Sequence, residues 1–263
     1  MIELRNISKI FAEKGKPSVT ALRDVSLRVE KGEFLTLIGP SGCGKSTLLY
    51  ILAGLEKATA GDLTLHDRAI AGPGPDRTIV FQDFVLYPWL TVRKNVAFGM
   101  KLGASRGKHR PPEIEARVQQ LLKVVGLSRF ENHYPYELSG GMKQRVAIAR
   151  ALALDPEVLL MDEPFGALDA QTRRIMQEEL LRIWEATRKT IIFVTHSIEE
   201  AVFLSNRVLI ITARPGQIKQ QVRIDLPRPR DFDALRNDAR FITHCGDMWA
   251  SIKEEVQKSI ETE

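Results

Sequence analysis

The stretch Gly39-Pro40-Ser41-Gly42-Cys43-Gly44-Lys45-Ser46-Thr47 follows the pattern G-x-x-x-x-G-K-[ST]. The apolar run at 33–38 predicts a buried strand before it, and the apolar run at 48–53 predicts the first turns of a helix after it. A strand, a glycine-rich loop and a helix in this order form the context in which the pattern binds phosphate groups. The alternative is a glycine turn with a chance lysine, but a chance match in a chain this long is about a one-in-a-hundred event.

The residue types of this loop indicate how phosphate would bind. Its three glycines allow the backbone to curl until several N–H groups point into one concavity. The start of the following helix adds its partial positive charge. We expect Lys45 to reach the β- and γ-phosphates of a nucleotide, and the Ser46 hydroxyl to bind Mg²⁺.

The composition is that of an ordinary globular protein. The 263 residues suffice for one large domain or two small ones, with 44% hydrophobic and 27% charged residues. Cys43 and Cys245 are the only cysteines, so we expect neither a disulfide framework nor a cysteine-rich metal site. No apolar run is long enough to span a membrane and no signal peptide is evident, which indicates the cytoplasm. The net charge of +5 is too small to argue for nucleic acid.

The remaining pattern predicts a mixed α/β fold. Loose alternation at 2–7 and 20–29 predicts strands of an antiparallel edge sheet, joined by a turn at 13–18. Phe11 precedes this turn, and its spacing fits a ring stacked on adenine as well as it fits a core aromatic. The pattern also predicts strands at 61–70, 77–81, 158–162, 191–195 and 207–212. It predicts helices within 91–132, 138–153, 170–188 and 232–260, with a basic loop at 105–110.

Polar side chains follow three of the predicted buried strands. Gln82, the adjacent Asp162 and Glu163, and His196 lie at or just beyond carboxyl ends, where open α/β sheets bind ligands. Asp162 would hold Mg²⁺ directly or through water, and Glu163 would orient the water that attacks the γ-phosphate. Neighbouring residues of a strand point to opposite faces, so the two acids should have different roles. A lone histidine is usually structural, but Lys45 and the four polar residues together favour one shared site.

A second glycine-rich helix start lies at Leu138-Ser139-Gly140-Gly141-Met142. It resembles the first chemically but has no lysine. The alternative is a simple serine N-cap. Because a cap does not require two glycines, the pattern favours an anion-binding role for Ser139, Gly140 and Gly141.

In combination, these motifs resemble the ATP-binding-cassette (ABC) ATPases. The loop at 39–47, Gln82, the 138–142 signature, the 158–163 strand end, Asp169 and His196 occur in that family's order, and the resemblance covers about residues 1–230. Met142 departs from the commonest signature, which has Gln there, but the serine and both glycines remain. Within the family, the chain is similar to the nitrate/sulfonate/taurine/bicarbonate importer subgroup. The segments that carry this similarity are 74–77, 80–82, 86–89, 95–99, 165–169, 198–201 and 226–230.

The resemblance implies a P-loop ATPase core with an antiparallel β-subdomain, an inserted helical subdomain at about 91–153 and a helical C-terminal extension at 231–263. It implies ATP and Mg²⁺ as ligands and a head-to-tail dimer with a second ATPase subunit, either identical or a close paralogue, in which Ser139–Gly141 of one subunit covers the ATP on Lys45 of the other. The residues implied to contact ATP are Phe11, Gly39, Pro40, Ser41, Gly42, Cys43, Gly44, Lys45, Ser46, Thr47, Ser139, Gly140 and Gly141. The implied Mg²⁺ ligands are Ser46, Gln82 and Asp162, and the implied catalytic residues are Glu163, His196 and Gln82.

The resemblance also implies membrane partners. Two such subunits would lie under permease subunits at the cytoplasmic face of the membrane, served indirectly by an extracytoplasmic solute-binding protein. The segment 83–90 is apolar, aperiodic and broken by Pro88, which predicts a groove for a permease helix near Phe84–Leu90. The alternative is a small local core under the helical subdomain.

Three other classes of P-loop protein fit less well. Chromosome-maintenance ATPases need hundreds of coiled-coil residues between loop and signature, whereas 48–137 holds one small helical region. Ribosome-acting translation factors carry two cassettes, whereas this chain has one phosphate loop and one signature. A P-loop kinase would lack 138–142. The sequence does not name the transported solute.

Cys43 lies inside the phosphate loop next to a helix start, where a thiolate is favoured. This position predicts that alkylation blocks ATP binding and that MgATP protects. The alternative is a buried, inert small side chain.

Overall fold

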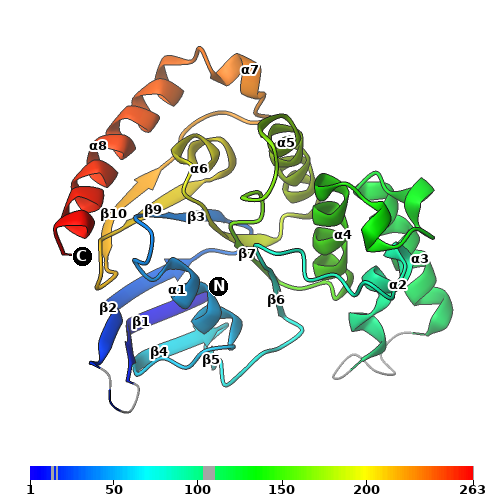
Figure 1. The fold of residues 1–263 in the computed structure, drawn as a ribbon, viewed down its shortest axis with the longest axis horizontal. Helices are drawn as coiled ribbons and strands as arrows, with labels where there is room; N and C mark the ends of the chain where they lie inside the picture. The colour runs from blue at the N-terminus through cyan, green and yellow to red at the C-terminus, as the bar shows by residue number, and fades with distance from the viewer. Residues whose placement is uncertain (13–14, 16, 103–109, 263) are drawn as a thin grey trace. The chain divides into compact units, whose positions relative to one another are not determined.

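The computed structural model describes residues 1–12, 15, 17–102 and 110–262. The turn expected at 13–18 and the basic loop expected at 105–110 lie largely outside these residues. The chain divides into two compact units, which are described separately (Figure 1). Unit 1 comprises Met1–Pro73 and Thr190–Glu263, and unit 2 comprises Gly74–Lys189.

Unit 1 contains the predicted antiparallel sheet. Its strands are β1 (Ile2–Phe11), β2 (Val19–Val29), β4 (Ala60–Leu65) and β5 (Arg68–Ala69), in the order β2-β1-β4-β5. The central β1 pairs antiparallel with both neighbours, so that Leu4 lies opposite Leu27 and Leu63. Leu4 and Leu27 are buried, as the alternating pattern requires of the inward face.

Unit 1 also contains four strands in the order β10-β9-β3-β8. These are β3 (Phe34–Ile38), β8 (Thr190–Val194), β9 (Arg207–Ile211) and β10 (Ile218–Arg223). β3 is parallel to β8 and β9, and all residues of β3 and β8 are buried, as expected of parallel strands covered on both faces. The antiparallel edge strand β10 was not predicted, because its polar residues form no buried run.

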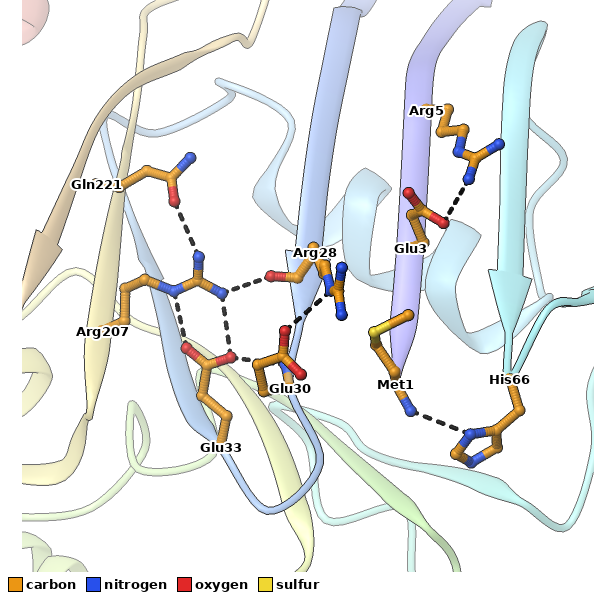
Figure 2. Close-up of polar contacts among 9 residues, drawn as sticks. All are labelled: Met1, Glu3, Arg5, Arg28, Glu30, Glu33, His66, Arg207 and Gln221. Atoms are coloured by element: carbon orange, nitrogen blue, oxygen red, sulfur yellow. Dashed lines mark hydrogen bonds and ion pairs between the residues drawn. The ribbon is translucent and has the colours of Figure 1, made fainter.

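A polar cluster around Arg207 joins neighbouring strands of unit 1 (Figure 2). Arg207 binds Glu33 through two parallel contacts, Nε to Oε1 at 2.7 Å and Nη2 to Oε2 at 3.0 Å. The same guanidinium donates to the carbonyl oxygen of Arg28 at 2.6 Å and to Oε1 of Gln221 at 2.9 Å. Bidentate contacts of this kind are geometrically specific. The cluster therefore ties β2, the start of β3, β9 and β10 at the edge opposite the phosphate loop.

Helices complete unit 1. They are α1 (Lys45–Ala53), α6 (Ile198–Leu204), α7 (Phe232–Leu235) and α8 (Ala239–Thr262). α8 packs on α6 and β9 (Figure 1), with Phe241, Met248 and Ile252 buried along one stripe. The predicted helical tail is confirmed.

Unit 2 combines two parallel strands with helices. β6 (Arg77–Val80) and β7 (Val158–Asp162) are parallel neighbours. The helices are α2 (Val92–Ala97), α3 (Pro111–Val124), α4 (Gly140–Ala153) and α5 (Ala170–Thr187), with short 3-10 turns η1 (Gly99–Lys101), η3 (Ser128–Phe130) and η4 (Pro135–Glu137). α2, α3 and α4 pack on one another within the predicted helical insertion, whose boundaries stay a prediction. Among the described residues, no helix has both the length and the apolar character needed to cross a bilayer.

Candidate active site

The phosphate loop, residues 39–47, joins the end of β3 to the start of α1 in unit 1. Gly42 and Gly44 have φ angles of 71° and 99°, in the left-handed region that favours glycine. A Cβ at Gly39 would lie 2.7 Å from the carbonyl oxygen of Ile211, and one at Gly44 would lie 2.8 Å from Leu22 Cδ2. Backbone curvature and close packing therefore both require glycine here, and the loop has the shape that a row of anion-binding N–H groups needs.

Lys45 lies inside the curl of this loop. Its Nζ donates to the carbonyl oxygens of Gly39 at 2.9 Å and Pro40 at 2.8 Å, and its side chain is buried. The ammonium is therefore held at the loop before any phosphate arrives. Curled backbone, helix start and ammonium fit a nucleoside triphosphate, and Ser46 lies in the first turn of α1, where its predicted contact with Mg²⁺ stays a prediction.

Cys43 corrects one expectation. Its side chain is buried at 1% exposure. Burial raises the pKa of the Cys43 thiol, and the nearby Lys45 ammonium, with Nζ 3.7 Å from Sγ, only partly opposes this rise. The predicted thiolate is wrong, because desolvation outweighs the attraction of the lysine and the helix start.

His196 and the phosphate loop leave the sheet side by side. Leu37 of β3 pairs with Val194 of β8, and Gly39 and His196 each follow two residues later. His196 is exposed, while the next residue, Ser197, caps α6 by accepting from the N–H of Glu200 at 3.3 Å. Parallel register thus brings His196 to the edge that carries the phosphate loop.

The parallel strands β6 and β7 of unit 2 bring two site residues together in the same way. Val80 of β6 pairs with Met161 of β7, and Gln82 and Glu163 each follow two residues later. A Cβ at Gly166 would lie 3.4 Å from the carbonyl oxygen of Glu163 and 3.5 Å from Nε2 of Gln82, so the structure brings these residues together.

The two adjacent acids differ in setting. Asp162 is the last residue of β7 and is buried, whereas Glu163 lies beyond the strand, half-buried, with a φ of 45°. Strand alternation therefore does not govern the direction of Glu163, contrary to the argument from sequence. A non-glycine residue in this region carries backbone strain of the kind that clusters at functional sites.

The second helix start also lies in unit 2. Ser139 is the N-cap of α4, and its Oγ accepts from the N–H of Met142 at 3.3 Å. A Cβ at Gly141 would lie 2.6 Å from Cγ2 of Thr172 on α5, so this glycine permits the close approach of α4 and α5. The alternative role of Ser139 as a cap is present, and its contact with a nucleotide stays a prediction.

Asp169 is the N-cap of α5. Its Oδ1 accepts from the N–H groups of Thr172 at 3.0 Å and Gln171 at 3.1 Å. The hydrogen bond from Thr172 is the main reason that the pKa of Asp169 lies below its ordinary value. This segment is therefore ordered from within unit 2.

Phe11 ends β1 and is 42% exposed, so the alternative that it is a core aromatic is wrong. Lys9 Nζ lies 4.7 Å from the centroid of the Phe11 ring. The exposed ring is suited to stacking, and its contact with adenine stays a prediction.

The segment 83–90 has a fixed backbone, with apolar side chains that are partly half-buried and partly exposed. The buried Asn95 holds it, because Asn95 Nδ2 donates to the carbonyl oxygens of Tyr87 and Leu90 at 3.1 and 2.8 Å. Arg150 donates to Val85 and Phe84 carbonyl oxygens. Val85 is 55% exposed and Trp89 is 70% exposed, whereas the Tyr87 ring packs on Phe98 with centroids 4.2 Å apart, so both the docking groove and the local core stay predictions.

Comparison with known proteins places this geometry in a family. The family model described as "ABC transporter" matches residues 22–166. The chain belongs to the ABC transporter family. It is 52% identical to an uncharacterized ABC transporter ATP-binding protein of Methanocaldococcus jannaschii, over 98% of this chain and 94% of that protein.

Two relatives of this ABC ATPase carry specific names. One is the nitrate import ATP-binding protein NrtD of Synechocystis sp., 48% identical over 86% of this chain and 83% of the relative. The other is the aliphatic sulfonates import ATP-binding protein SsuB of Bacillus licheniformis, 45% identical over 99% of this chain and 94% of the relative. A solved dimeric ATP-binding cassette in a post-hydrolysis state with ADP and Pi matches with a TM-score of 0.74 and 35% identity, covering 86% of this chain and 100% of that one. The predicted family, fold class and ATPase activity are thereby confirmed.

The predicted site residues of this ABC ATPase divide between the units. Phe11, residues 39–47 and His196 belong to unit 1, whereas Gln82, Ser139–Gly141, Asp162 and Glu163 belong to unit 2. Their union in one shared site stays a prediction. Arg214, whose guanidinium donates to the carbonyl oxygen of Gly42 in the phosphate loop, was not predicted, because only a turn is evident in its sequence.

Proposed function

We propose that this ABC ATPase is the motor subunit of an importer for small anions of the nitrate, sulfonate, taurine or bicarbonate class. The observation that carries the proposal is the phosphate loop built around Lys45, in a chain 45–48% identical over most of its length to proteins named for nitrate and aliphatic sulfonate import. The loop supports ATP as the energy source, and the named relatives support the solute class.

Different residues of the site would bind the phosphates, bind Mg²⁺ and activate the attacking water. The loop N–H groups and Lys45 hold the phosphates, while Ser46 and Asp162 hold Mg²⁺, which neutralises phosphate charge when bound. Glu163 accepts a proton from the attacking water while the water oxygen forms a bond to the γ-phosphorus. The bond between the γ-phosphorus and the oxygen that bridges it to the β-phosphate breaks, which yields ADP and phosphate. Gln82 and His196 would sense and contact the γ-phosphate.

A second ATPase subunit would complete the site. The α4 start has a serine and two glycines, and its lysine, Lys143, follows the glycine pair instead of lying in a glycine-rich loop as Lys45 does, which suits it to cover a nucleotide held elsewhere. In the dimer that we propose, Ser139–Gly141 of one subunit covers the ATP on Lys45 of the other. The dimeric state of the solved cassette supports this assembly.

Permease subunits would dock on the segment 83–90 at the cytoplasmic face of the membrane. The exposed Val85 and Trp89, on a backbone held by Asn95, support this assignment. A solute-binding protein outside the membrane would then deliver the anion, without direct contact with this chain.

The decisive experiment is to isolate the membrane complex with this subunit and measure its ATPase with solute-loaded binding proteins. Stimulation by a binding protein loaded with nitrate, a sulfonate, taurine or bicarbonate is expected. A complex without a permease, or one stimulated only by another kind of solute, would refute the importer or the anion class respectively.

A double variant tests the docking surface. Tyr87→Ala with Trp89→Ala should release the subunit from its permease, since an aromatic anchor contributes about 2 kcal/mol or more to such an interface. Nucleotide binding by the isolated subunit should persist. Tyr136→Ala is the matched control, because Tyr136 is a similarly exposed aromatic of unit 2 outside the segment. A large fall in the melting temperature of the isolated double variant would show that these rings support the subunit's own core instead.

A further inference from the structure

The turn at 212–217, between β9 and β10, packs against the outside of the phosphate loop within unit 1. The N–H of Gly216 donates to Ala21 at 2.9 Å, and its carbonyl oxygen accepts from Arg23 at 3.0 Å. A Cβ at Gly216 would overlap the carbonyl oxygen of Cys43. Gly216 is therefore closely packed between β2 and the phosphate loop. A movement of the turn would displace the loop as well.

Arg214 lies in this turn and donates hydrogen bonds to the phosphate loop. Its Nε and Nη2 donate to the carbonyl oxygen of Gly42 at 3.3 and 3.1 Å. The peptide unit that joins Gly42 to Cys43 is planar, and in a trans unit the N–H points opposite to the carbonyl. By holding the Gly42 carbonyl, Arg214 fixes the orientation of this peptide unit, so that the Cys43 N–H points away from the guanidinium.

The C-terminal helix in turn holds the residue before Arg214. Oε2 of Glu255, on α8, accepts from the N–H of Ala213 at 3.0 Å. Oε1 of Glu255 lies 2.9 Å from Nζ of both Lys219 and Lys258. Glu255 is 2% exposed, so its position is fixed by packing as well as by hydrogen bonds.

Glu255 keeps its charge in this setting. Burial alone would raise the pKa of Glu255, but hydrogen bonds from Lys258, Lys219 and the Ala213 N–H together lower it to about 2. A buried carboxylate with this many donors is costly to displace. The packed stripe of Met248 and Ile252 places it, so the contact depends on docking of α8.

We propose that α8 sets the geometry of the phosphate loop through Glu255 and Arg214, and that both are positioning residues for nucleotide binding. This inference rests on the proposed role of the loop in binding phosphate. A site of backbone N–H groups binds tightly only if those groups are already oriented. α8 therefore acts on nucleotide affinity through the contacts of Glu255 and Arg214.

The test measures MgADP binding to the purified chain by calorimetry, together with KM and kcat for MgATP. Arg214→Met keeps an unbranched apolar stem but removes the guanidinium donors, and Glu255→Met keeps the length of the side chain on α8 but removes its acceptors. Each should raise the Kd for MgADP by about tenfold, the loss of one modest hydrogen bond, and raise KM with kcat little changed. Glu255→Gln keeps an oxygen for the Ala213 N–H and should restore most of the affinity.

A matched control and a double variant separate positioning from general stability. Glu254→Gln alters the neighbouring carboxylate, which pairs with Lys219 on the exposed side of the helix, and should leave the Kd unchanged. The double variant Arg214→Met with Glu255→Met should bind MgADP no more weakly than the weaker single variant, because both act through one chain of contacts. Melting temperatures of all variants report on folding, and Arg214 is exposed, so its variant should fold.

Each result bears on the proposal. Normal MgADP binding by Arg214→Met would overturn it, and additive losses in the double variant would overturn the link from α8 to Arg214. Lys45→Met provides the separate check on the loop. If Lys45→Met also binds MgADP normally, the phosphate site itself is refuted; if it fails to bind while Arg214→Met and Glu255→Met bind normally, only the positioning role is refuted.

Discussion

The two units begin a helix at a glycine-rich turn in different ways. In unit 1, the N-cap of α1 is Gly44, which has no side chain to offer, and the preceding loop is supported from outside by Arg214 and from inside by Lys45. In unit 2, the N-cap of α4 is Ser139, whose own hydroxyl accepts from the N–H of Met142. The first helix start leaves its orientation to surrounding groups, and the second is capped by its own residue.

This difference suggests a division of labour. The α1 start, with an ammonium and a supported loop, has the groups needed to hold an anion alone. At the α4 start the serine is already engaged as a cap, and the lysine of the first turn, Lys143, follows the glycine pair. We therefore expect unit 1 to determine nucleotide affinity, and unit 2 to contribute chemistry through Glu163 and closure through Ser139.

The strongest test of this division is Glu163→Gln. The substitution keeps the size of the side chain but removes the base, so hydrolysis should fall by about 10²- to 10⁴-fold. MgATP binding should remain, and the ATP-bound dimer should accumulate. Steady-state ATPase, calorimetry and size-exclusion chromatography measure the three quantities. Turnover near that of the parent would exclude Glu163 as the base.

The next test compares the two helix starts directly. Lys45→Met should weaken MgATP binding by the isolated chain about 100-fold, since it removes charge-assisted contacts to phosphate. Ser139→Ala should leave that binding within about twofold and instead slow hydrolysis and dimer formation. Equal losses of affinity in the two variants would contradict the division between units.

A third test concerns why α4 needs glycine. Gly141→Ala should destabilise the chain by about 1–3 kcal/mol, because the new methyl group would lie against Thr172. Gly140→Ala is the matched control, since its Cβ would meet only the ends of two side chains, Leu168 Cδ2 at 3.3 Å and Phe84 Cζ at 4.0 Å. Thr172→Ser removes the obstructing methyl and should restore stability in the double variant. Denaturant unfolding measures all of these, and a stable Gly141→Ala variant would show that this glycine serves the ligand alone.

Local motifs made much of the fold and site predictable. The loop at 39–47 and the buried strand ends at Asp162 and Val194 are encoded in short, contiguous patterns, and the structure has them in place. Parallel register then accounts for Gln82 lying near Glu163.

Long-range and environmental effects were not predictable in this way. Arg214 meets Gly42 across 172 positions of sequence and Glu255 meets Ala213 across 42, and no local pattern marks such pairs. The polar strand β10 lacks an apolar signal because it is an edge strand. The left-handed backbone of Glu163 is a conformation that glutamate rarely adopts, so only the structure reveals it.

Cys43 provides the smallest and last test, because it asks whether the loop of unit 1 is as tightly packed as its supports indicate. Burial raises the pKa of the Cys43 thiol, so at pH 7–8 less of the reactive thiolate is present than in an open peptide. Iodoacetamide should therefore modify Cys43 at least about tenfold more slowly than a peptide thiol, and the rate should keep rising with pH beyond about 8.5, where an ordinary thiol is half ionised.

Cys245, whose pKa burial raises to about 11, should also react slowly, so modification must be followed for each cysteine by mass spectrometry of its peptide. Lys45→Met should slow Cys43 further, because the ammonium is the group that favours the thiolate. Rapid modification of Cys43 at pH 7 in the folded chain would show that the loop opens readily, and it would remove the contrast between a firmly supported α1 start and a self-capped α4 start.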